Sequence, residues 1–129
     1  MDEPDPLYCE VFVESDLTEA DLTSLIRKLV NGEQKRWSIQ SDLCEIEVQR
    51  NKRIMQPASG ERSFVNFPYY LDIFPTPPAR TNRSGYVEAV GKLLEGLWGL
   101  GYDAVAACDF EDELPRFGGY NSEERPRTS

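Results

Sequence analysis

The chain has 129 residues, of which 40% are hydrophobic and 29% charged, and this composition predicts one globular domain with a single core. Its formal net charge of −9 repels phosphate backbones, which argues against nucleic acid as a partner and favours a basic protein surface. No apolar run approaches the roughly 20 residues of a membrane span, and the acidic N-terminus lacks the pattern of a signal peptide. We therefore expect a cytoplasmic protein that makes no membrane contact.

The three cysteines stand far apart, and the chain has no histidine. An odd number of cysteines without a pattern argues against a disulfide framework and fits a reducing compartment. Histidine is the commonest general base and the commonest metal ligand, so the chain lacks both. The sequence also lacks a nucleophile elbow, a phosphate-binding loop and a dinucleotide fingerprint, so we expect neither an enzyme nor a cofactor.

The N-terminal part predicts a strand followed by a helix. Residues 1–6 are acidic and broken by proline, which indicates a loose end. Residues 8–14 alternate in polarity and are rich in β-formers, as in a strand. Thr18 is a candidate helix cap with Asp21 three residues later, and an apolar stripe at helical spacing follows over residues 22–30.

The middle of the chain predicts a second and a third strand. The second lies within residues 37–49, and the basic segment 50–62 reads as a hairpin loop. The third covers residues 64–74, with Pro68 marking a bulge or an irregular start. The prolines at 75, 77 and 78 are expected to end it.

The remaining elements are a helix, a strand and a tail. Ser84 is the expected cap of a helix over residues 85–100, whose glycines indicate close approach to the sheet or to the other helix. A fourth strand is predicted over 102–110, and residues 116–129 are expected to form a flexible tail. The order βαββαβ within a single domain, residues 1–115, predicts an α+β fold. Its expected form is a ferredoxin-like sandwich with a four-stranded antiparallel sheet and two helices on one face.

Strand alternation divides the predicted sheet into a covered and an open face. Unpaired carboxylates avoid a core, so the helices should cover the face that carries Cys9, Cys44, Cys108 and Phe67. The residues expected on the open face, with the turn that follows the last strand, are the candidate partner-binding residues: Tyr8, Glu10, Phe12, Glu14, Glu45, Glu47, Tyr70, Asp72, Phe74, Asp109, Glu111, Asp112 and Glu113.

Aromatic rings inside a charged rim are typical of a protein contact site. Three other interpretations remain open. The N-terminal segment or the tail could cover the rings, the acids at 109–113 could only protect an edge strand, or the face could join two copies of the chain. The net charge favours a monomer when free. A further alternative is a sensor or enzyme that binds a small molecule or a divalent metal through Tyr70, Asp72 and Asp109, or a metal through Asp109, Glu111 and Asp112.

The segment from Tyr86 to Glu95 and the segment Leu100 to Pro115, which reads LGYDAVAACDFEDELP, resemble the C-terminal half of small bacterial proteins of the immunity type. The resemblance covers about a quarter of the chain and includes no catalytic motif. It implies a cytoplasmic, non-enzymatic inhibitor that binds a cognate toxin and blocks a basic active site.

Overall fold

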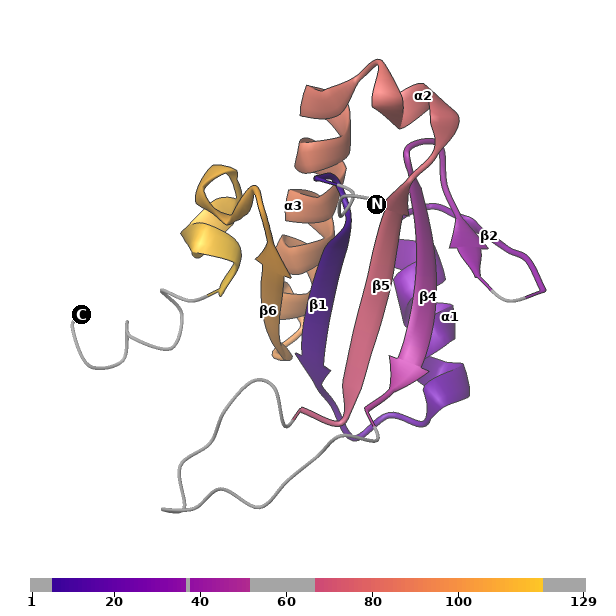
Figure 1. The fold of residues 1–129 in the computed structure, drawn as a ribbon. Helices are drawn as coiled ribbons and strands as arrows, with labels where there is room; N and C mark the ends of the chain where they lie inside the picture. The colour runs from indigo at the N-terminus through magenta and orange to yellow at the C-terminus, as the bar shows by residue number, and fades with distance from the viewer. Residues whose placement is uncertain (1–5, 37, 52–66, 120–129) are drawn as a thin grey trace.

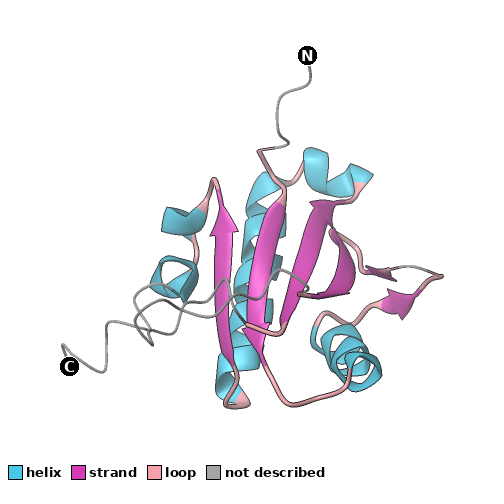
Figure 2. Cartoon of the chain, turned by 60° about the horizontal axis from the view of Figure 1, so that its bottom comes forward, coloured by secondary structure: helices cyan, strands magenta, loops and turns pink. Residues whose placement is uncertain are grey.

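The computed structural model describes residues 6–36, 38–51 and 67–119. These residues form an antiparallel sheet with α1 and α3 on one side (Figure 1, Figure 2). In chain order the elements are β1 (Cys9–Glu14), α1 (Glu19–Leu29), β2 (Glu33–Gln34), β3 (Ile39–Gln40), β4 (Cys44–Arg50), β5 (Tyr69–Pro75), α2 (Pro77–Arg80), α3 (Arg83–Gly99), β6 (Asp103–Cys108), and the 3-10 turns η2 (Glu111–Glu113) and η3 (Pro115–Gly119).

The predicted α+β class with an antiparallel sheet is confirmed, but the sheet has six strands where four were predicted. The strand order is β2-β3-β4-β5-β1-β6, so the four predicted strands stand side by side and a short hairpin extends their β4 edge. The segment predicted as one strand over 37–49 contains β3 and β4. It is divided because the Ser41 hydroxyl accepts a hydrogen bond from the Cys44 amide at 3.1 Å, which closes a tight turn.

The helices also depart from the prediction in number and in one cap. β5 ends at Pro75 as expected, but Pro77 and Pro78 also open the short helix α2, since proline fits the first helical turn. Thr18 caps α1 as expected, accepting from the Asp21 amide at 3.1 Å. The cap of α3 is Asn82 rather than Ser84, because the Asn82 side chain accepts from the Gly85 amide at 3.2 Å.

The core lies between the sheet and the two long helices. The inner-face residues of β1 and β5, together with Leu22 and Ile26 of α1 and the apolar positions of α3, are buried in one cluster. The predicted close approach of a glycine is confirmed at Gly96, where an added Cβ would lie 2.9 Å from Leu29 Cδ2. Tyr86 is fully buried and its hydroxyl donates to the Leu7 carbonyl at 2.5 Å, which ties α3 to the segment before β1.

The segment after β6 is packed further than predicted. Residues 116–119 belong to η3, whereas the flexible tail was expected to begin at 116. Gly119 has a φ of +107°, and an added Cβ there would lie 2.4 Å from the Ala104 carbonyl oxygen. The rest of the predicted tail, most of the predicted basic loop and residues 1–5 of the predicted loose end lie outside the described residues. Within the described part of the chain, no helix has the length and apolar character needed to cross a membrane.

Candidate functional site

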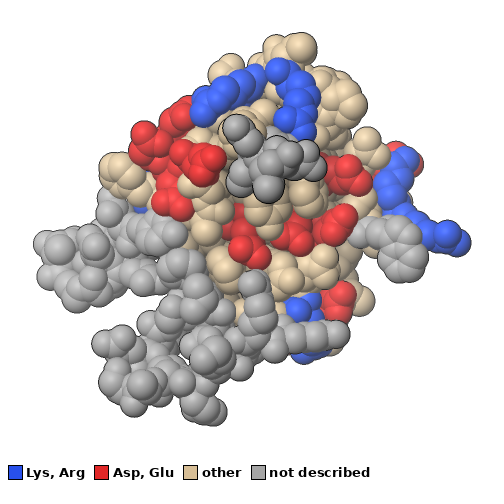
Figure 3. Space-filling model, viewed as in Figure 1, with Lys and Arg blue, Asp and Glu red and all other residues tan. Residues whose placement is uncertain are grey.

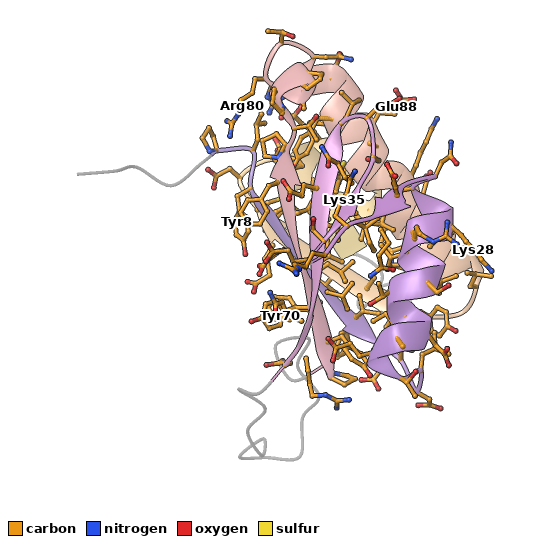
Figure 4. The ribbon with its side chains drawn as sticks, turned by 90° about the vertical axis from the view of Figure 1, so that its right-hand side faces the viewer. Tyr8, Lys28, Lys35, Tyr70, Arg80 and Glu88 are labelled. Atoms are coloured by element: carbon orange, nitrogen blue, oxygen red, sulfur yellow. The ribbon has the colours of Figure 1, made fainter. Side chains whose placement is uncertain are left out.

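The candidate site is the face of β4, β5, β1 and β6 that points away from α1 and α3, here called the open face. Figure 4 shows Tyr8 and Tyr70 projecting to the side opposite α1, which carries Lys28. In Figure 3, which shows this face, acidic side chains lie across the middle of the molecule and a second acidic group lies to the upper left. Strand register determines which of these side chains are neighbours.

Three carboxylates form a line across the centre of the open face. Glu47 of β4 stands opposite Asp72 of β5, and Asp72 stands opposite Glu10 of β1. We call Glu47, Asp72 and Glu10 the acidic row. Directly opposite residues in antiparallel strands have Cβ atoms about 4.5–5.5 Å apart, so these like charges are close and repel one another. All three side chains are partly exposed.

An aromatic pair flanks the acidic row on one side. The rings of Tyr8 and Phe74 have centroids 5.2 Å apart, and the Tyr8 hydroxyl donates a hydrogen bond to the Asp72 carboxylate. The pKa of Tyr8 is raised, chiefly because the phenol is partly buried and further because of its hydrogen bond to Asp72 and the nearby negative charges. Tyr8 therefore stays protonated at neutral pH and holds Asp72 in a fixed position.

A second aromatic pair, Phe12 and Tyr70, flanks the row on the other side with centroids 6.1 Å apart. Phe12 is only 5% exposed, because it packs with Phe67 and Val105 in a small second cluster. Phe12 was predicted to contact the partner, and this prediction is wrong because its side chain is buried. Phe12 is thus buried among its neighbours, while Tyr70 remains partly exposed.

Phe67 was predicted to face the helices, and this prediction is wrong. Pro68 interrupts the alternation, β5 begins only at Tyr69, and Phe67 joins the cluster on the open side. Buried Asn51 fixes this approach, since its Nδ2 donates to the Phe67 carbonyl at 2.8 Å and its amide donates to the Pro68 carbonyl at 2.8 Å. Sequence reasoning missed Asn51, although a buried asparagine next to a strand end is a common device for bonding the backbone.

Two further predicted acids lie at the margins of the face. Glu45 stands opposite Phe74 and accepts a hydrogen bond from the Ser38 hydroxyl at 3.1 Å. Glu14 stands opposite Asp103 at the other end of β1. Both are partly exposed and extend the negative surface beyond the acidic row.

The acidic cluster after β6 divides into residues with different roles. Glu111 accepts from the Cys108 amide at 2.9 Å and so shapes the turn. Glu113 forms two hydrogen bonds with the Arg83 guanidinium, at 2.7 and 2.6 Å, and this contact lowers the pKa of Glu113. Asp109 and Asp112 are exposed. The structure therefore places Glu111 and Glu113 in the anchoring of η2 rather than in the acidic row.

The described side chains of the open face form a broad acidic and aromatic surface. A cavity of about 370 Å³ lies between α1, the β2–β3 hairpin and β4 and includes Glu47 in its lining, and one of about 400 Å³ lies along α3 beside Pro115. Within residues 6–36, 38–51 and 67–119, no group of three or more acidic or thiol side chains is placed to hold a metal ion. Such a surface can bind a macromolecule through charge and ring contacts.

Comparisons of the chain with protein-family models, with curated proteins and with solved structures gave no match. The geometry of the open face therefore supplies the observations that bear on function.

Proposed function

We propose that this protein is an acidic binding module that uses its open face to hold a basic partner protein. The observation that carries the proposal is the acidic row between two aromatic pairs. Three like charges on adjacent strands repel one another, and a cation on the partner that lies among them would be attracted by all three. A surface of this sign also steers a basic partner toward the face.

The arrangement fits an arginine or lysine side chain of the partner. Residues two apart on a strand are separated by roughly 7 Å. One guanidinium placed between a ring and a carboxylate at that separation can contact both. A guanidinium can bond to a carboxylate and stack on an aromatic ring at the same time. Tyr8 supplies both a ring and the bond that positions Asp72.

We further propose that the protein is an immunity-type inhibitor that acts in the cytoplasm on a cognate toxin, within a ferredoxin-like fold. This proposal is supported by the resemblance of the segments 86–95 and 100–115 and by the net charge of −9. The order of the four long strands, β4-β5-β1-β6, is compatible with that fold. The partner would be a basic protein encoded beside this one.

The test is binding of the neighbouring gene product by calorimetry, with two triple variants of equal charge change. The first variant, Glu10→Gln, Glu47→Gln and Asp72→Asn, removes the acidic row. The matched control, Glu33→Gln, Glu95→Gln and Asp16→Asn, removes the same charges from exposed positions away from the open face. We expect the first variant to weaken binding at least 100-fold, because buried or partly buried charge contacts contribute roughly 1.5–3 kcal/mol each.

The control variant should lose less than about 10-fold, through weaker long-range attraction only. Equal losses of affinity in both variants would show that binding depends only on the net charge of the protein. That result would contradict the proposed site. A neighbouring product that binds neither the wild type nor the control at low salt would contradict the proposed partner.

A further inference from the structure

Two of the three cysteines face each other across adjacent strands. Cys9 of β1 stands directly opposite Cys108 of β6 in the antiparallel register. Opposite Cα atoms in such a pair are about 4.5–5.5 Å apart, which lies within the range of about 4.4–6.8 Å that a disulfide spans. The register therefore places the two cysteines at a separation that a disulfide can span.

The two thiols interact but differ in environment. Cys9 is fully buried, whereas Cys108 is partly exposed. The hydrogen bond between the thiols and burial raise the pKa of Cys9. The same bond and the Phe110 backbone amide lower the pKa of Cys108. The accessible sulfur is thus the better nucleophile, and the buried sulfur is placed to attack it afterwards.

The third cysteine provides a contrast within the same chain. Cys44 of β4 stands opposite Pro75 and has no cysteine across from it. Burial raises the pKa of Cys44 to about 11, so its thiol stays protonated and unreactive at neutral pH.

We propose that Cys9 and Cys108 form a reversible disulfide by exchange with a low-molecular-weight disulfide such as oxidised glutathione. The Cys108 thiolate attacks one sulfur of the reagent, the reagent's S–S bond breaks, and one thiolate leaves. The Cys9 thiolate then attacks Cys108 Sγ, forms the Cys9–Cys108 bond and expels the second thiolate. The two protons of the protein thiols pass to the leaving thiolates, so the reagent is reduced to two thiols and the protein is oxidised by two electrons.

This site is independent of the proposed partner-binding role. The bond would join residues 99 positions apart (108 − 9), in the two strands that lie at one side of the sheet. In a reducing compartment the dithiol is the resting form, and the disulfide forms when the thiol pool becomes oxidised. The oxidised protein should resist unfolding more than the reduced protein, since the cross-link restricts the unfolded chain.

The experiment incubates the folded full chain with oxidised glutathione, alkylates the remaining thiols in denaturant and measures intact and peptide masses. For the wild type we expect a loss of two hydrogen atoms, one alkylated cysteine at Cys44, and a peptide pair that contains Cys9 and Cys108. Cys44→Ser should give the same disulfide with no alkylation. Cys9→Ser should stop at a glutathione adduct on Cys108.

Thermal unfolding supplies a second readout on the wild type alone. The oxidised form should melt roughly 5–15 °C higher than the reduced form, and added dithiothreitol should reverse the shift. Three alkylated cysteines, a lasting glutathione adduct on the wild type, or a bond to Cys44 would each overturn the proposal. An unchanged or lowered melting temperature in the oxidised form would contradict the claim that the native sheet accommodates the bond.

Discussion

At the scale of single residues, Tyr8 connects the chemistry of the open face to its geometry. Its ring packs on Phe74 and its hydroxyl bonds to Asp72, the central member of the acidic row. A phenol is well suited to this position, because it donates one hydrogen bond to a carboxylate without neutralising the charge. The residue therefore fixes the acid and leaves its negative charge to attract a partner.

Tyr8→Phe should lower the free energy of unfolding by about 1 kcal/mol at pH 7, the net value of one hydrogen bond. The folded pKa of Tyr8 is raised, so this stabilisation is complete below the pKa of an exposed tyrosine near 10 and is lost as the pH rises above it. The difference between wild type and variant should shrink between pH 9 and pH 11. Urea unfolding at several pH values measures it.

The control is Tyr102→Phe, which removes a hydroxyl for which no hydrogen bond is seen among the described residues. This variant should stay within about 0.5 kcal/mol of the wild type at pH 7. A loss of stability in Tyr8→Phe no larger than that in Tyr102→Phe at pH 7 would contradict a stabilising role for the bond to Asp72.

At the scale of elements, local patterns predicted most of the fold. Alternation and apolar spacing located β1, α1, β6 and the length of α3, and they placed Cys9, Val11 and Val13 on the covered face. The predicted element boundaries were wrong where a side chain forms a hydrogen bond with the backbone. Ser41 closes a turn inside a run of β-formers, and Asn82 competes successfully with Ser84 for the helix cap.

The alternation of residues along each strand predicted which face of the sheet carries the candidate site, but it did not predict which side chains are neighbours. Alternation placed Glu10, Glu47 and Asp72 on one face, yet only the register makes them direct neighbours. The burial of Phe12 could not be predicted, because it depends on Phe67 crossing to the open side before Pro68. Likewise, the pairing of Glu113 with Arg83 joins residues that are far apart in the chain.

Thr18→Ala should destabilise the protein by about 1 kcal/mol, since the start of α1 loses the acceptor of the Asp21 amide. The matched control is Thr23→Ala, four residues inside the helix boundary, where the hydroxyl bonds back to the Glu19 carbonyl at 2.8 Å. Alanine is the better helix former there, so the control should be neutral or slightly stabilising. Denaturant unfolding compares the two, and equal losses would contradict the capping role of Thr18.

At the scale of the whole molecule, the acidic face affects folding and binding in opposite directions. A net charge of −9 favours encounter with a basic surface and disfavours compaction of the free chain. Both effects of negative charge are strongest at the acidic row, where three carboxylates are neighbours. Asp72 also accepts the stabilising hydrogen bond from Tyr8, so the repulsion is best tested at Glu47.

Glu47→Gln should therefore stabilise the isolated protein by a few tenths of a kcal/mol at low ionic strength, because it relieves repulsion with Asp72 across the strands. The gain should diminish in roughly 0.5 M salt, where screening weakens the repulsion in the wild type. Thermal melts at two salt concentrations measure the effect. A loss of stability at low salt would indicate that Glu47 contributes to folding instead.

The position of β1 between β5 and β6 has a consequence for the order in which the chain can fold. This strand is hydrogen-bonded to β5 on one side and to β6 on the other, through pairs such as Cys9 with Ile73 and Cys9 with Cys108. Both neighbours are synthesised long after β1, so one edge of β1 has no partner until β5 is made and the other has none until β6 is made. Contacts of such large sequence separation slow folding, so the sheet around β1 can be completed only after the end of β6 has been synthesised.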